Sequence, residues 1–243
     1  RSPIKNLKKI TNSLSAIKQI IPKGAIVQTY PFYDGAIEFS LAESDRYCIG
    51  CTKSAPVHEF WEYASKDPKK VSLMADKMFP VLNENTFDLL RKGWHRQIDP
   101  YMRSASFFLL NRCSNLGMIT HGELDTKNFN PISINELRTF KIENFHSVLI
   151  SSSEEYETIN RVDFNLFNGG RYYFDLLDTE PSIGLEESPF RHSVMLSRFK
   201  GTPSIFIYQY HPRLSKMKGY SMIFLDQHGR ITTEENAKEI ILH

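Results

Sequence analysis

Apolar and polar positions along the chain follow two periods, one typical of helices and one typical of buried strands. Apolar residues recur at helical spacing from Leu7 to Ile21, which predicts an amphipathic helix ended by Pro22. A shorter helix that starts after Asn12 or Ser13 is the alternative, because either residue can cap a helix. Short apolar runs bounded by turn residues predict buried strands at residues 25–30, 47–51, 148–150, 171–174, 203–208 and 220–225.

Helical patterns lie between several of these strands. The run at 25–30 leads through a turn at Gly35 into a helix, which makes half of a doubly wound unit. This alternation predicts an α/β fold, in which ligands bind at the carboxyl ends of the strands. Further helices are expected at residues 57–63 and 104–110, and after Ser133 as a cap with Glu136 three positions later. Helical patterning from Val71 is broken by Pro80, and Asn83 or Asn85 can cap a next helix that runs to Gly93.

Length and charge limit the possible classes of protein. A chain of 243 residues can bury a core in one domain with a smaller appended lobe. Its longest apolar runs fall well short of the roughly 20 residues that span a membrane, so no membrane partner is expected. The start at Arg1 rather than Met indicates a trimmed end, so a removed targeting segment stays open. The net charge of +2 neither requires nor excludes nucleic acid.

The chain contains three cysteines, Cys48, Cys51 and Cys113. An odd number without a dense framework favours an intracellular location, cytoplasmic or, in a eukaryote, nuclear. Cys48 and Cys51 have C-x-x-C spacing, so redox and zinc chemistry are alternatives to a structural role. The pair lies within a predicted strand, which points the two side chains to opposite faces, and no second ligand pair follows. We therefore expect structural cysteines and no metal site.

The stretch from Ser104 to Pro131 joins an apolar helix to a turn-rich segment. Its motifs are Leu110-Asn111-Arg112, Asn115-Leu116-Gly117 and Asn128-Phe129-Asn130-Pro131. This run resembles the central segment of the Dam-like DNA adenine methyltransferases, in which "LNR…G…G.FN.P" leads from the catalytic domain into a DNA-reading hairpin. The run at 239–242 also resembles the final strand of that family.

The resemblance implies a Rossmann-like methyltransferase sheet with helices on both faces, formed by residues 1–69 and 141–243. It implies a small helical and hairpin insertion at residues 70–140, which corresponds to the DNA-recognition part. Double-stranded DNA is then an expected partner. The candidate DNA-binding residues are Asn111, Arg112 and Asn115, which would position the insertion, and His121 and Lys127, which would contact phosphates. Turn chemistry is the alternative, because Asn and Gly supply unusual backbone angles.

Motifs that approach S-adenosylmethionine in this family are incomplete here. Ser2-Pro3-Ile4-Lys5 keeps only the beginning of "SPIRYPGGK", without its Gly-Gly pair. In the motif "EPFAGGGA" the bulky or acidic residues Tyr30, Tyr33 and Asp34 replace smaller or differently charged ones. The family positions that remain at the first turn are Pro31, Phe32 and Gly35.

Cys51 stands where the family has a cofactor-binding Asp, and a thiol cannot offer the two acceptors of a carboxylate. The resemblance therefore implies that Pro31, Phe32, Gly35 and Cys51 are vestigial cofactor positions in a crowded pocket. We expect no bound cofactor, or S-adenosylmethionine if the chain is active.

The catalytic tetrapeptide of the family, Asp-Pro-Pro-Tyr, is also altered. The resemblance aligns residues 156–167 with a family helix and 171–174 with the strand before the tetrapeptide. Asp175 or Asp178 then holds the acidic position, but neither precedes Pro-Pro-aromatic. The reaction needs acceptors that hold the amine of an extruded adenine and aim its lone pair at the methyl group. Without the rigid turn, that geometry is lost.

These features predict a catalytically degenerate protein that acts as a scaffold, either on DNA or on a protein partner such as an active paralogue. The alternative is an active, divergent S-adenosylmethionine-dependent adenine-specific DNA methyltransferase that uses Asp175 or Asp178.

Overall fold

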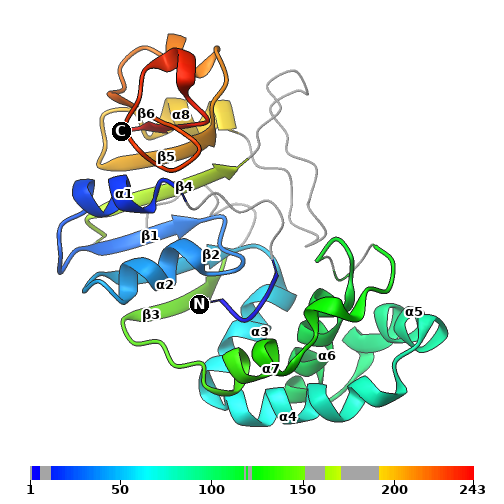
Figure 1. Cartoon of the computed structure of the whole chain (residues 1–243). Helices are drawn as coiled ribbons and strands as arrows, with labels where there is room; N and C mark the ends of the chain where they lie inside the picture. The colour runs from blue at the N-terminus through cyan, green and yellow to red at the C-terminus, as the bar shows by residue number, and fades with distance from the viewer. Residues whose placement is uncertain (1, 6–11, 118, 120–121, 151–161, 171–191) are drawn as a thin grey trace. The chain divides into compact units, whose positions relative to one another are not determined.

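The computed structural model describes residues 2–5, 12–117, 119, 122–150, 162–170 and 192–243. These residues form two compact units, one built around strands and one built from helices (Figure 1). The sheet unit contains residues 12–53, 143–150, 162–170 and 192–243. The helical unit contains residues 2–5 and the described part of Ser54–Ile142.

The described residues of the sheet unit form a seven-stranded sheet in the order β3-β2-β1-β4-β5-β7-β6. β7 runs antiparallel to β5 and β6, and the other neighbours are parallel. The order 3-2-1-4-5 is that of a doubly wound sheet, with its switch point between β1 and β4. The strands are β1 (Ile26–Tyr30), β2 (Tyr47–Thr52), β3 (Phe145–Leu149), β4 (Phe164–Gly170), β5 (Ser204–Gln209), β6 (Met222–Leu225) and β7 (Glu239–Leu242).

Helices cover both faces of this sheet. On one face, Phe39 of α2 packs on Phe145, whose ring lies next to Gly50. On the other face, Leu196 of α8 joins Cys51 in a buried cluster. Gly50 and Cys51 are consecutive in β2 and so point to opposite faces, which places α2 and α8 on opposite sides. The α/β, Rossmann-like prediction is confirmed. The helices of this unit are α1 (Leu14–Ile20), α2 (Ala36–Ala42) and α8 (His192–Arg198), with 3-10 turns η4 (Leu214–Lys216) and η5 (Glu234–Asn236).

Two predicted elements differ from the structure. α1 begins after Ser13, as the shorter alternative has it. β4 lies where the resemblance implied the end of a helix at 156–167, and the strand expected at 171–174 falls outside the described residues. Pairing on both sides fixes β4, because it hydrogen-bonds to β1 and to β5. Asn165 and Asn168 interrupt its apolar run, so the hydrophobic pattern of the sequence did not predict a strand there.

The helical unit is organised around α6, whose residues from Ser104 to Asn111 are all buried. Phe107 and Phe108 of this helix pack on Phe60 and Phe129, with ring centroids 5.0 Å apart for Phe60–Phe107 and 5.8 Å for Phe108–Phe129. The elements are α3 (Ala55–Lys66), α4 (Pro68–Met78), η1 (Phe79–Val81), α5 (Glu84–Gly93), η2 (Trp94–Arg96), α6 (Pro100–Cys113), η3 (Thr126–Asn128) and α7 (Pro131–Arg138).

The boundaries of this unit differ from the predicted insertion at 70–140. The helical unit begins at Ser54, because Phe60 and Trp61 of α3 pack on Phe107 and Phe140 of the same unit. It also includes residues 2–5. The cap of α7 differs as well: Asn130 and Ser133 form the capping box, so the helix starts at Pro131, before the predicted cap Ser133.

None of the helices within the described ranges is long and apolar enough to cross a membrane.

Candidate functional site

The carboxyl ends of β1 and β4 meet at the switch point of the sheet, where ligands bind in this architecture. Tyr30 pairs with Phe167, so the residues that follow both strands lie at one edge. The predicted cofactor positions Pro31, Phe32 and Gly35 lie in the turn between β1 and α2, and Cys51 lies near the end of the neighbouring β2. The structure thus brings these four predicted residues to the same edge of the sheet.

Aromatic rings occupy the space beside both glycines of this edge. Gly35 has a φ of +71°, and a Cβ built on it would lie 2.2 Å from the ring of Phe39. A Cβ on Gly50 would lie 2.6 Å from the ring of Phe32. Phe145 packs on both rings, with centroid distances of 5.1 Å to Phe32 and 5.0 Å to Phe39. These glycines are therefore explained by packing against rings inside the protein, without a ligand.

Two acidic side chains are buried beside the same turn. Asp34 Oδ1 accepts a hydrogen bond from Ala36 N at 3.2 Å, which stabilises the start of α2. Burial raises the pKa of Glu38 to about 7; backbone amides and Thr29 oppose the rise, and the charge of Asp34 adds to it. Asp34 and Glu38 are only 8% and 5% exposed. Both carboxyl groups are therefore enclosed by the protein beside this turn.

Cys48 and Cys51 are fully buried free thiols in β2. Cys51 lies in the cluster under α8, and burial raises the pKa of each thiol to about 12. Zinc binding and redox exchange need thiolates, so this environment supports the structural interpretation. Within the described ranges, no cluster of three His, Cys, Asp or Glu side chains has the geometry of a metal site.

The end of β4 carries residues that the sequence did not single out, Asn168, Gly169 and Gly170. The pairing with β5 shifts register between Asn168 and Gly170, which marks a bulge, and bulges often re-aim side chains at functional edges. A Cβ on Gly169 would lie 1.9 Å from the ring of Tyr208, so the ring lies directly against the backbone. In the sequence, the Gly169-Gly170 pair was the feature that could have indicated an irregular strand end here. Asp175 and Asp178 fall outside the described residues.

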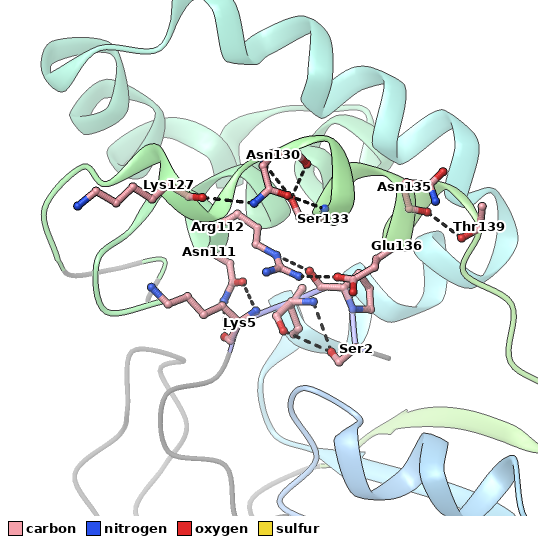
Figure 2. Close-up of polar contacts among 12 residues, drawn as sticks. Ser2, Lys5, Asn111, Arg112, Lys127, Asn130, Ser133, Asn135, Glu136 and Thr139 are labelled. Carbon is pink, nitrogen blue, oxygen red and sulfur yellow. Dashed lines mark hydrogen bonds and ion pairs between the residues drawn. The ribbon is translucent and has the colours of Figure 1, made fainter.

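In the helical unit, the predicted DNA-binding residue Asn111 is fully buried at the end of α6. Its Oδ1 accepts from Lys5 N at 2.6 Å, and its Nδ2 donates to Lys5 O at 2.9 Å and to Gly117 O at 2.7 Å. Figure 2 shows the amide of Asn111 directed at the backbone of Lys5. Both ends of this side chain are thus engaged within the unit.

Arg112 also contacts the N-terminal segment. Its Nε donates to Pro3 O at 2.6 Å, and its Nη2 lies 3.4 Å from Glu136 Oε2 in α7 (Figure 2). Burial lowers the pKa of Arg112, with Glu136 opposing this. The Asn-Arg pair therefore holds residues 2–5 against α6, a role that the sequence pattern did not reveal.

Asn115 and Lys127 belong to the turn-rich segment after α6. Asn115 Oδ1 accepts from Glu123 N at 3.1 Å, and an isolated bridge joins Ser114 to Leu124, so the segment folds back as a short hairpin. Lys127 is exposed in η3. His121 lies outside the described residues. Of the predicted contacts that are described, Lys127 is the one whose side chain is most available to a partner.

No family model matches the chain, and no curated protein matches it either. The resemblance to Dam-like enzymes therefore depends on the chain's own motifs and topology.

Proposed function

We propose that this chain is a catalytically degenerate relative of the Dam-like methyltransferases that acts as a scaffold, on DNA or on a protein partner, without a bound methyl donor. The observation that carries the proposal is the packing of Phe32, Phe39 and Phe145 into the space beside Gly35 and Gly50. A glycine-rich first turn normally lets the backbone approach a cofactor. Here internal rings take that place.

The order of the strands agrees with the Rossmann-like sheet that the resemblance implies. The sheet has the 3-2-1-4-5 order of a doubly wound sheet, with the antiparallel β7 between β5 and β6. At the switch point of the sheet, β4 ends in Asn168-Gly169-Gly170. Asp175 and Asp178, which the resemblance assigns to the acidic position, are not followed by Pro-Pro-aromatic, and this further supports lost catalysis. The free thiols of Cys48, Cys51 and Cys113 support work inside the cell, in the cytoplasm or nucleus.

Calorimetry with S-adenosylmethionine tests the cofactor part of this proposal. We expect no saturable heat at ligand concentrations up to about 1 mM, where an affinity of even −4 kcal/mol would be visible. An active Dam-like enzyme in the same buffer serves as the positive control. A micromolar dissociation constant for this chain would contradict the proposal.

A salt-dependent DNA shift assay separates the two kinds of scaffold. If DNA is the partner, affinity must fall as salt rises, because each neutralised phosphate releases counterions. Lys127→Ala should then weaken binding and lower the salt slope by about one. Lys77→Ala, which removes an exposed lysine from α4, is the matched control. Absence of any shift at low salt would favour a protein partner.

The active enzyme is the second candidate, and one observation favours it. The sequence keeps two acidic residues, Asp175 and Asp178, after β4, and a carboxylate can accept hydrogen bonds from an amine. Transfer of a labelled methyl group to duplex DNA, lost in Asp175→Ala or in Asp178→Ala, would establish this activity. No transfer above background is the result we expect.

A further inference from the structure

The end of α6 and the turn after it hold residues 2–5 as a short peptide (Figure 2). The amide of Asn111 pairs with both the N–H and the C=O of Lys5, and Arg112 Nε donates to Pro3 O. These contacts join residues more than 100 positions apart, so local chain geometry does not impose them. Because these hydrogen bonds go to backbone atoms of Pro3 and Lys5, they fix which residues of the segment lie beside Asn111 and Arg112.

The side chains of Ile4 and Lys5 are also held within the helical unit. Ile4 is 4% exposed, so an aliphatic side chain fills a buried position. Lys5 Nζ donates to Asn115 O at 2.9 Å and to Ser114 O at 3.3 Å. These carbonyls follow the C-terminus of α6, where the helix dipole favours a cation.

The turn is shaped around the lysine stem. Gly117 has a φ of +66°, and a Cβ built on it would lie 3.2 Å from Lys5 Cγ, so a side chain there would press on the stem. Burial lowers the pKa of Lys5, the charge of Asp125 opposes this, and the charge of Arg112 adds to it. The site therefore combines hydrogen bonds to the backbone of the segment, a buried position for an aliphatic side chain, and two carbonyl oxygens that accept from an ammonium group.

We propose that this is a peptide-binding site of the helical unit, selective for an extended segment in which an aliphatic residue precedes lysine, and that residues 2–5 are its ligand in cis. Such a ligand can be exchanged: the same peptide supplied in trans binds a chain from which the segment has been removed. This inference does not depend on the proposed scaffold function.

The test uses the chain without residues 1–5 and a fluorescent peptide that copies residues 1–6. We expect saturable anisotropy with the shortened chain and none with the full chain, whose own segment fills the site. A peptide with Lys5→Met keeps the stem and removes the ammonium group, and should bind about tenfold more weakly, as loss of a charge-assisted hydrogen bond predicts. Asn111→Asp in the shortened chain should weaken binding at least as much, because Asp cannot donate to Lys5 O.

Tryptophan fluorescence covers the case in which the shortened chain fails to fold. Trp61 and Trp94, the two tryptophans of the sequence, both lie in the helical unit, so their emission reports on this unit. In that case the peptide should restore the native emission in a saturable way, and the Lys5→Met peptide should do so at about tenfold higher concentration. Neither binding nor restoration, or equal effects of both peptides, would overturn the proposal.

Discussion

Two regions that the sequence marked as facing a ligand, the first turn of the sheet unit and the end of α6 in the helical unit, are both satisfied inside the protein, but by different means. At the first turn, rings of Phe32 and Phe39 fill the space beside glycines. At the end of α6, Asn111 and Arg112 hydrogen-bond to the backbone of residues 3–5. Apolar filling leaves no room for a ligand, whereas the hydrogen bonds at the end of α6 form the site at which we propose that one peptide can replace another.

The substitution Gly35→Ala should give the largest effect. A positive φ costs a non-glycine residue roughly 1–2 kcal/mol, and overpacking against Phe39 costs roughly 1–3 kcal/mol more. We expect the sheet unit to lose about 2–5 kcal/mol in chemical denaturation followed by circular dichroism.

Gly24→Ala is the matched control, because Gly24 also has a positive φ of +81° and a Cβ built on it would meet no described atom within 4 Å. It should cost only the conformational part, about 1–2 kcal/mol. Equal costs for the two substitutions would mean that the space beside Gly35 is open, which would break the contrast between the regions.

The substitution Asn111→Asp should be next. It removes two donated hydrogen bonds and places a charge in a fully buried position, so we expect a loss of about 2–4 kcal/mol, measured by tryptophan fluorescence during denaturation. Asn115→Asp is the control, because the side-chain oxygen of Asn115 accepts from Glu123 N and an aspartate keeps this acceptor. Its effect should stay below about 0.5 kcal/mol.

Glu38→Gln should have an intermediate effect that depends on pH. Folded Glu38, with a pKa of about 7, keeps a proton that the unfolded chain releases near its ordinary pKa of 4.5. Stability should therefore fall as pH rises from about 4.5 to 7 and change no further above that window. At pH 8 the glutamine variant should be more stable by about 1–3 kcal/mol.

Glu239→Gln provides a second test in the same unit, since burial raises the pKa of Glu239 to about 7 as well. Each single variant should remove part of the fall in stability, and the double variant should remove more. A parent chain with flat stability across this window would contradict the buried state of both acids.

The smallest effect is expected for thiol reagents. Cys48, Cys51 and Cys113 are fully buried, and burial raises the pKa of each to about 12. No thiol should react with an aromatic disulfide in the native state at pH 8, and three should react after denaturation. Fast reaction of a native thiol would reopen redox chemistry at the C-x-x-C pair.

The sequence predicted the α/β class, and its apolar runs overlap β1, β2, β3, β5 and β6, because buried strands are apolar and bounded by turns. The run at 239–242, assigned from the resemblance, coincides with β7. The sequence misplaced β4, since Asn165 and Asn168 interrupt the apolar pattern and only pairing with two neighbours fixes this strand. The boundary of the helical unit was also missed, because the assignment of α3 depends on its contacts with Phe107 and Phe140.

For the candidate site, the motifs placed Pro31, Phe32 and Gly35 correctly at the end of β1. They could not reveal that Asn111 is paired with Lys5, because a contact across so many positions has no periodicity in the chain. Whether these residues contact DNA stays a prediction. Polar residue types indicate that hydrogen bonds form, but they do not identify the partner.

The helical unit has a further consequence through its place between β2 and β3. These strands are parallel neighbours, with Thr52 opposite Leu149, so the chain between them must return to the starting end of the sheet. A dozen or so residues suffice for such a return, and here Ser54–Ile142 provide it. The connection is therefore far longer than the crossover needs, and the helical unit that it forms is completed by residues 2–5 from the start of the chain.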